Sequence, residues 1–480
     1  MTSSGDAIVL NDAHSALNPT TVARVVRPDS VADVVAAVRA AALEGRGVSV
    51  AGSRHAMGGQ QFGTDTVHLD MRGMNRIVSL DVAGGIVNAE AGIDWAEMID
   101  GLLSLQAGHA DEPGAWGIRQ KQTGADQLTI GGALAADVHG RGLTQRPISA
   151  DVESFTLVDP SGDVREVSRT SDPDLFGLVI GGYGLFGVVT SVRLRLAPRR
   201  ILRRLVTLTS VDELIDRFDD RIANGFLFGD CQFSIDERSP DFLRVGIFSC
   251  YGPDETATAI PDGQRALSRM DWGRLLYLTH TDRAAAAEAY VSHYMATSGQ
   301  LYWSDLHQRS EYIAGYHATL DRALGATVPG SEIITELYVP RVRLAAFMAD
   351  AVEALRDADP LVVYGTIRLV KRDEEAVLAW AREPWACIIF NLHTPHDAAG
   401  LASSAEAFGQ LIDLARAHGG SFYLTYHRFA SIEQVDACHP RFREFVAAKR
   451  RFDPDERFTS DWYRHYAGAI ADRASRHGRD

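Results

Sequence analysis

The chain has 480 residues, of which 46% are hydrophobic and 23% charged, as in an ordinary globular protein of two or three domains. Its net charge of −15, without long like-charged runs, disfavours nucleic acid or an anionic membrane surface as a partner. We find no apolar run long enough to cross a bilayer and no secretory signal, so we expect a cytoplasmic protein. The four cysteines form no C-x-x-C pair, so neither a disulfide framework nor a metal site is expected.

The first predicted unit is a strand over residues 21–27, a helix over 31–42 with apolar positions on one face, and a second strand at 48–50. The second strand runs into a glycine-rich loop that ends near residue 62 and carries a single histidine, His55. A loop of small residues leaving a strand exposes backbone N–H groups, which can bind a pyrophosphate. An isolated histidine in such a loop more often has a structural role.

Two further glycine-rich segments follow. Residues 122–142 contain Thr-Ile-Gly-Gly-Ala-Leu-Ala and end in His-Gly-x-Gly, and residues 172–190 contain Asp-Pro-Asp-Leu-Phe followed by Gly-Gly and Gly-Val-Val-Thr. The small residues around Gly131 and Gly132 allow the backbone to approach a flat ligand, although tight helix packing explains them equally well. His139 is as compatible with a structural hydrogen bond as with a cofactor contact.

In this order, the three segments resemble the FAD-binding loops of the vanillyl-alcohol oxidase / p-cresol methylhydroxylase family, particularly the alditol, gulonolactone and decaprenylphosphoryl-ribose oxidases. The resemblance implies FAD as cofactor, with His55 joined covalently to the 8-methyl of the flavin ring. Because covalent attachment needs a neutral imidazole, we also expect the adjacent Arg54 to help keep His55 uncharged. Residues 122–130 lack the cysteine that forms a second anchor in some relatives. The residues implied to bind FAD are Ala51, Gly52, Ser53, Arg54, His55, Gly58, Gly59, Gln60, Thr123, Gly124, Gly131, Gly132, Ala135, His139, Gly140, Gly142, Gly187 and Val188.

Beyond residue 200, predicted helices alternate with strands. The helices are expected at 210–218, 283–296 and 343–358, and the strands at 201–208, 243–250, 332–340, 362–370, 386–392 and 421–426. We therefore expect an α+β protein: a two-subdomain FAD-binding domain (residues 1–200, PCMH-type), a substrate-binding domain with an antiparallel sheet covered by helices (201–430), and a C-terminal segment (431–480). By resemblance, this last segment returns to the FAD domain.

The catalytic groups are expected on the strands of the substrate domain. Arg368 and Thr366 share one face of the strand at 362–370, and Thr366 stands where alditol oxidase has a glutamate. Tyr426, or alternatively His427 on the opposite face of its strand, is a candidate base, and Glu336 could supply a carboxylate. The alternatives are an ion pair of Arg368 at a sheet edge and a solvated Glu336.

An aromatic and histidine-rich patch at 301–317, which includes Tyr312 and Tyr316, suits either a pocket wall or a packed core.

These observations predict an FAD-dependent oxidase or dehydrogenase that oxidises the CH–OH group of an alcohol, polyol, sugar or lactone by hydride transfer, followed by reoxidation by O2. Thr123 stands where relatives have a small residue that gates oxygen, so a dehydrogenase that uses an electron acceptor other than O2 is an open alternative. The alternative is a dehydrogenase or reductase of a sugar-lipid or sterol-like substrate with non-covalent FAD. A nicotinamide Rossmann enzyme is disfavoured because no G-x-G-x-x-G follows the first strand.

Overall fold

The computed structural model describes residues 7–110, 112, 114–310, 312–358 and 361–477. The chain begins with the short strands β1 (Ile8–Leu10) and β2 (Thr20–Val22), which pair with each other. A three-stranded parallel sheet follows, with β3 (Arg24–Val26) and β4 (Val48–Ala51) on either side of β5 (Val67–Asp70). Helix α1 (Val31–Leu43) covers this sheet because Val34, Val38 and Ala41 form a buried stripe, and Ser30 caps its first turn.

The second subdomain is an antiparallel sheet in the order β10 (Val164–Ser168), β9 (Val152–Val158), β11 (Val188–Pro198), β7 (Ile86–Glu90) and β6 (Ile77–Asp81), with β8 (Trp116–Ile118) also paired to β11. Helices α2 (Trp95–Leu105), α3 (Ile130–Ala136) and α4 (Pro173–Val179) belong to the same subdomain. Asp94 caps α2 with a reciprocal capping box, which fixes where that helix begins.

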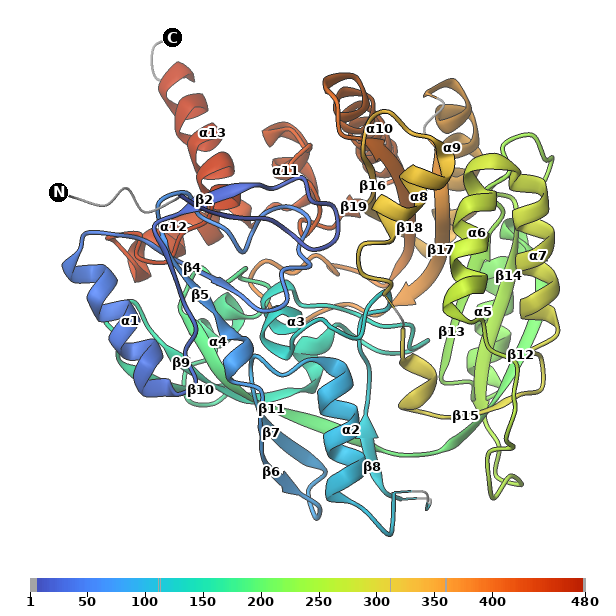
Figure 1. Ribbon diagram of the computed structural model, residues 1–480, viewed down its shortest axis with the longest axis horizontal. Helices are drawn as coiled ribbons and strands as arrows, with labels where there is room; N and C mark the ends of the chain where they lie inside the picture. Colours follow the sequence, from blue (N-terminus) through green and yellow to red (C-terminus); the bar gives the residue numbers. More distant parts are fainter. Residues whose placement is uncertain (1–6, 111, 113, 311, 359–360, 478–480) are drawn as a thin grey trace.

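The third part is an eight-stranded antiparallel sheet. Its order is β15 (Leu301–Trp303), β12 (Ile201–Ser210), β14 (Val245–Pro253), β13 (Phe228–Phe233), β17 (Val362–Val370), β18 (Trp385–Pro395), β16 (Gly330–Pro340) and β19 (Ser421–Phe422). One face packs against α5 (Leu214–Ala223), α9 (Leu344–Ala358) and α10 (Ala398–Ala417). Helices α6 (Arg269–Thr281), α7 (Arg283–Met295) and α8 (Tyr316–Leu324) lie beside one another at the same sheet (Figure 1).

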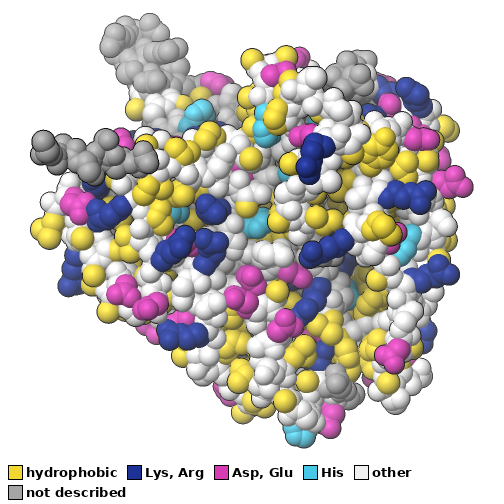
Figure 2. Space-filling view, viewed as in Figure 1, with side chains coloured by type: hydrophobic (Ala, Val, Ile, Leu, Met, Phe, Trp, Pro, Cys, Tyr) yellow, Lys and Arg dark blue, Asp and Glu magenta, His cyan; other side chains and the backbone are white. Residues whose placement is uncertain are grey.

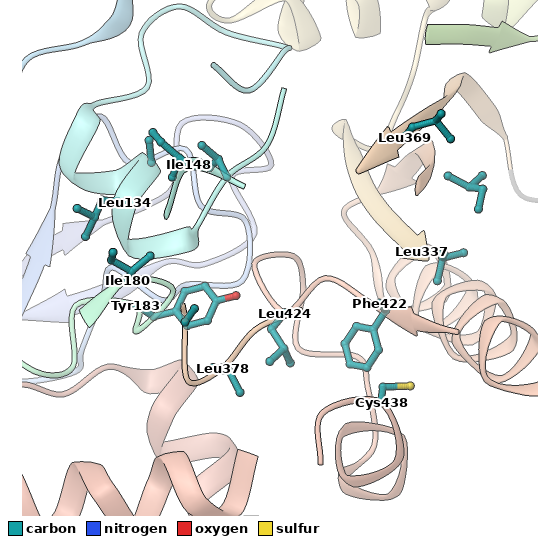
Figure 3. Close-up of a cluster of buried hydrophobic side chains, with 14 of the residues drawn as sticks. Leu134, Ile148, Ile180, Tyr183, Leu337, Leu369, Leu378, Phe422, Leu424 and Cys438 are labelled. Atoms are coloured by element: carbon teal, nitrogen blue, oxygen red, sulfur yellow. The ribbon is translucent and has the colours of Figure 1, made fainter. Parts of the chain in front are cut away.

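One core cluster spans the second subdomain and the eight-stranded sheet: Leu134 and Ile180 belong to the same cluster as Leu424 and as Leu337 of β16 (Figure 3). The parallel sheet and α1 have a smaller core of their own. The surface in Figure 2 intersperses acidic and basic side chains. Among the described residues, no helix has the length and apolar character needed to cross a membrane.

The last helices are α11 (Ile432–Cys438), α12 (Phe442–Phe452) and α13 (Asp461–His477). Between α12 and α13 the chain runs beside β4: the Val48 N–H donates to the Arg457 carbonyl at 2.6 Å, and the Thr459 N–H donates to the Val48 carbonyl at 3.0 Å. Phe458, fully buried, packs with Val34, Val48 and Val67. The boundaries near residues 200 and 430 stay predictions.

The α+β class and the antiparallel second sheet are confirmed, but several elements differ from expectation. The strand predicted at 421–426 ends at Phe422, because the chain then turns away from the sheet and buries Tyr423 and Leu424 as irregular backbone. The helix predicted at 210–218 begins at Leu214, after a 3₁₀ turn capped by Ser210. Helices α6 and α10 and strands β6 and β13 were not predicted.

We expect Phe458→Ala to lower the free energy of unfolding by about 3–5 kcal/mol, because it leaves a cavity between α1 and the parallel sheet. Urea unfolding followed by circular dichroism measures this effect. The control is Leu43→Ala, whose side chain is 91% exposed and which should change stability by less than about 0.5 kcal/mol. Equal effects of the two variants would contradict the packing role of Phe458.

Candidate active site

A cavity of about 430 Å³ lies between the glycine-rich loops and the eight-stranded sheet. Its volume falls within the range of small-molecule and cofactor sites. One side is formed by residues from the loop after β4, from α3 and the segment before it, and from the segment that ends at Gly187. The other side is formed by side chains of β16, β17 and β18, and by aromatic residues of α6 and the 312–316 segment. The three predicted loops therefore meet at one cavity.

Glycine permits the close approaches that shape the loop side. A Cβ on Gly52 would lie 2.0 Å from Thr129 Oγ1, and one on Gly131 would lie 3.0 Å from the Ala91 Cβ. Gly124 has φ +109° with open space beside it, and Gly187 has φ +148°. Only glycine tolerates these contacts and angles at low cost, so the cavity wall there is bare backbone.

Most residues predicted to bind the cofactor line the cavity. They are Ala51, Gly52, Ser53, Arg54, His55, Gln60, Thr123, Gly124, Gly131, Gly132, Ala135, His139 and Gly187.

The others lie behind the wall. Gly58 lets the 424–426 segment approach, since a Cβ there would be 2.2 Å from the Tyr426 carbonyl, and Gly59 has φ +74°. Gly140 and Gly142 pack against Lys121 and Gln145, and Val188 is fully buried in the core around α1.

His55 lies at the cavity wall beside two aromatic rings. Its ring centroid is 5.3 Å from that of Tyr312, in an edge-to-face arrangement, and 6.4 Å from that of His14. Burial lowers the pKa of His55, Asp12 opposes that shift and the Arg54 charge adds to it, so the ring is neutral at pH 7. Its Nδ1 is buried without a hydrogen-bond partner. A neutral imidazole nitrogen is therefore available at the cavity.

The conformation of Arg54 helps to place this ring. Its φ of +61° lies in the left-handed region, which costs about 1 kcal/mol for a residue other than glycine. The Ala13 N–H donates to the Arg54 carbonyl at 2.8 Å and holds the strained residue in place.

Glu336 on β16 is the acceptor at the centre of a buried network. It is 3% exposed, and its carboxylate accepts from His139 Nε2 at 2.7 Å, from the Tyr338 hydroxyl at 2.5 Å, from the Cys387 thiol at 3.3 Å and from the Tyr426 hydroxyl at 3.1 Å. Burial raises the pKa of Glu336, but His139, Tyr338 and Arg368 outweigh it and lower that pKa to about 2. The solvated alternative for Glu336 is therefore wrong.

Both ring nitrogens of His139 face oxygen acceptors. Its Nδ1 lies 3.0 Å from the Gly140 carbonyl, which can only accept, and its Nε2 faces the ionised Glu336. The ring also packs against Trp380, with centroids 5.1 Å apart. A buried histidine–carboxylate contact of 2.7 Å therefore joins the second glycine segment to the sheet.

Arg368 reaches the cavity from the middle of the sheet. Strand β17 lies between β13 and β18, so the sheet-edge alternative is wrong. The Arg368 guanidinium donates to the Thr123 hydroxyl, and its Nε is buried without a partner. Thr366 is fully buried and bonds to Asp230 at 3.3 Å instead of lining the cavity.

Tyr426 and His427 have different surroundings. Tyr426 lines the cavity, and burial together with Glu336 raises the pKa of its hydroxyl well above the ordinary value, so it stays protonated. His427 does not line the cavity: its Nε2 lies 3.3 Å from Ser15 Oγ, and burial lowers its pKa to about 4. The argument that placed the two on opposite faces of a strand does not hold, because the strand ends before them.

Several cavity residues were not singled out from the sequence. Tyr364 shares the cavity-facing side of β17 with Arg368, a position that the alternation of the strand could have revealed. Tyr312 and Tyr316 of the aromatic patch line the cavity, whereas His307 packs between Phe228 and Tyr251. Trp272 and Leu276 lie on α6, a helix that was not predicted. Other lining residues lie in segments that were predicted as strands or glycine loops but had no individual signal of their own: Ile334, Ile389, Asn391, Tyr183 and Tyr423.

Comparison with known proteins agrees with this geometry. The FAD binding domain family matches residues 22–168. Decaprenylphosphoryl-beta-D-ribose oxidase of Mycolicibacterium smegmatis is 24% identical over 462 residues, which are 92% of this chain and 94% of that protein. L-gulono-1,4-lactone dehydrogenase of Mycobacterium tuberculosis is 23% identical over 452 residues, 92% of this chain and 96% of that protein. Cytokinin dehydrogenase 2 of Oryza sativa is 30% identical over 186 residues, 37% of this chain and 31% of that protein.

The fold, the cavity and these similarities define an FAD-dependent oxidoreductase. Within that class, the matched domain and the similar proteins support the FAD-linked oxidase family of the p-cresol methylhydroxylase type. The predicted family and enzyme class are thereby confirmed.

Glu336→Gln should destabilise the protein by about 1–3 kcal/mol at pH 7, because an amide cannot accept all four hydrogen bonds that reach this carboxylate and leaves buried donors unsatisfied. The pKa of Glu336 falls from 4.5 to about 2 on folding, so the ionised carboxylate contributes stability above pH 4.5 and loses it as pH falls toward 2. The stability gap between wild type and variant should therefore narrow below about pH 5.

Urea denaturation at a series of pH values measures that gap. Glu444→Gln is the control, because this side chain is 57% exposed in a surface pair with Arg441 and should cost less than about 1 kcal/mol. A gap that stays constant from pH 7 down to pH 4 would show that Glu336 is not ionised in the folded protein.

Proposed function

We propose that this protein binds FAD in the cavity and oxidises a CH–OH group of a sugar, sugar lactone or polyprenyl-linked sugar, with the flavin attached through His55 and reoxidised by O2. The observation that carries the proposal is the meeting of three glycine-rich loops with Arg368, Tyr426 and Glu336 around one cavity. The names of the similar ribose oxidase and gulonolactone dehydrogenase support a sugar or lactone as substrate.

The cavity residues fit a large, flat, polar cofactor. Several lining side chains have buried polar atoms without a hydrogen-bond partner, which a bound molecule would satisfy. These atoms are Arg54 Nε, His55 Nδ1, Gln60 Oε1, Gln61 Oε1, Gln122 Nε2, Arg368 Nε and Asn391 Oδ1. FAD, when bound, would accept the hydride that leaves the substrate carbon.

The chain's own groups would bind the substrate and move its hydroxyl proton. Arg368 has a free Nε–H that can donate to a substrate oxygen. Because the Tyr426 proton points to Glu336, the lone pairs of its oxygen are free to accept the substrate hydroxyl. The substrate hydroxyl proton would pass to Tyr426 Oη while the Tyr426 hydroxyl proton moves to Glu336 Oε2. The low pKa of Glu336 keeps its carboxylate ionised before this transfer.

A dehydrogenase or reductase with non-covalent FAD and another electron partner is the second candidate. Thr123 favours it, because its side chain lines the cavity and is held by Arg368 at the position predicted to gate oxygen. Hydrogen peroxide formed in step with substrate oxidation supports the oxidase. Turnover only with an added dye or quinone supports the alternative.

The four cysteines are buried and free in the structure, which supports a location in the cytoplasm. We also retain residues 1–200, 201–430 and 431–480 as the proposed domains.

His55→Gln should release all its flavin when the purified protein is denatured in acid, whereas the wild type should keep flavin fluorescence on the polypeptide. His14→Gln is the matched control, because it removes a neighbouring imidazole from the same cavity wall and leaves His55 in place. Peptide mass mapping locates the adduct. If the wild-type protein releases its FAD in acid, the covalent link through His55 is excluded, whereas the proposal that the cavity binds FAD is unaffected.

Tyr426→Phe should slow anaerobic reduction of the bound flavin by substrate about 10²–10⁴-fold, because it removes the group that accepts the hydroxyl proton. Stopped-flow absorbance measures this rate. Tyr423→Phe is the control: it also lines the cavity, but its hydroxyl donates to the Ala136 carbonyl and is not available to the substrate. An unchanged rate in Tyr426→Phe would exclude the proton path through this residue.

A further inference from the structure

Behind the wall of the cavity, the fold brings together a second cluster of potential metal ligands. Glu332 on β16, His393 on β18 and His280 at the end of α6 each offer one ligand atom, and these atoms lie within 4.8 Å of one another. They are far apart in the sequence, so no ligand spacing could have revealed them. We propose that Glu332, His280 and His393 form a site for a divalent transition metal, with Zn²⁺ as the fitting ion.

The distances match those of a metal site. Glu332 Oε1 lies 3.3 Å from His393 Nδ1 and 3.8 Å from His280 Nε2. Zinc bonds of about 2.0–2.1 Å in tetrahedral geometry place neighbouring ligand atoms about 3.3–3.4 Å apart. An ion can therefore enter among the three atoms with small side-chain adjustments. Two histidines and a glutamate are also one of the ligand sets that proteins use for zinc.

A fourth ligand is close at hand. His317 Nδ1, on α8, lies 2.9 Å from Glu332 Oε2, the carboxylate oxygen that also accepts from the Tyr316 hydroxyl. A shift of the His317 imidazole toward Glu332 Oε1 would give a tetrahedral set of three histidine nitrogens and one carboxylate oxygen. Alternatively, a water molecule would occupy the fourth coordination position.

The unsatisfied atoms in the cluster point to a missing ligand. His280 Nε2 and His317 Nε2 are buried without a hydrogen-bond partner. The His280 side chain is 5% exposed, and Glu332 is fully buried. A buried imidazole nitrogen without a partner costs free energy, and coordination to a metal would recover it.

The position of this site gives the metal a structural role. Helix α6 carries Trp272 and Leu276 into the cavity, and α8 begins with Tyr316 at the cavity wall. Strand β16 also carries Glu336, which lies four residues after Glu332, two pleat repeats along the same face. A bound ion would fasten both helices to the sheet and so fix the wall that faces the proposed substrate site.

The test uses full-length holoprotein without a polyhistidine tag, stripped with a chelator and then equilibrated with Zn²⁺ or Co²⁺. Elemental analysis after gel filtration should find about one Zn²⁺ per chain. Co²⁺ should give the visible bands of a tetrahedral site, at wavelengths beyond the absorption of the flavin. Wild-type protein that retains no Zn²⁺ and gives no cobalt bands would overturn the proposal without affecting FAD binding.

Glu332→Gln and His393→Ala should each weaken Zn²⁺ binding more than about 100-fold, since changes in the outer shell alone cost up to that much. Zn²⁺ should raise the thermal midpoint of the wild type but not that of these variants. His418→Ala is the control, because His418 pairs with Asp350 at 2.7 Å outside the cluster. If Glu332→Gln does not fold, His280→Gln gives the same comparison. Equal metal retention in all variants would mean an adventitious ion only.

Discussion

The buried pair of His139 and Glu336 is the interaction on which the proposed active site depends. His139 comes from the second glycine segment and Glu336 from the substrate sheet, so their 2.7 Å contact joins the two halves of the cavity. The same carboxylate orients Tyr338 and Tyr426, and its charge faces Arg368. Breaking a buried hydrogen-bond network leaves polar groups unsatisfied and is costly, which suits an element that fixes geometry.

Glycine supplies the complementary constraint on the loop side. Where Gly52 meets the Thr129 side chain and Gly131 meets Ala91, there is no room for a side chain on the glycine. The bare backbone leaves the wall flat, while polar atoms such as His55 Nδ1 and Gln122 Nε2 remain buried and unpaired. A rigid, polar and flat wall opposite a charged sheet is suited to holding an aromatic ring system with its edges hydrogen bonded.

The sequence predicted the parts of this fold that depend on local patterns. Helix α1 and strand β17 were found because their buried residues repeat with the helix and strand periods, and the loops because glycine marks close backbone approach. Helix α10 was missed because its buried face includes Ala407 and Ala415, which contrast weakly with the exposed alanines around them. The segment after Phe422 was wrongly predicted as a strand. Its aromatic residues Tyr423 and Tyr426 line the cavity and do not belong to the sheet.

The site residues also divide into those with a local sequence signal and those whose role depends on contacts between distant segments. His55 and Arg368 stood out as a histidine in a glycine loop and a charge in an apolar strand, and both line the cavity. The contact of His139 with Glu336, and the cluster around Glu332, depend on pairings between distant segments that no local pattern encodes.

The strand pairing between Val48 and the segment at Phe458 also has a consequence for biosynthesis. Residues at opposite ends of the chain complete one small sheet, so its contacts are among the least local in the molecule. Such contacts form slowly, because the intervening chain must be ordered first. On the ribosome, β4 and the His55 loop must wait for nearly the whole polypeptide to emerge before their core closes. Cofactor capture is therefore expected to be a late, post-translational event.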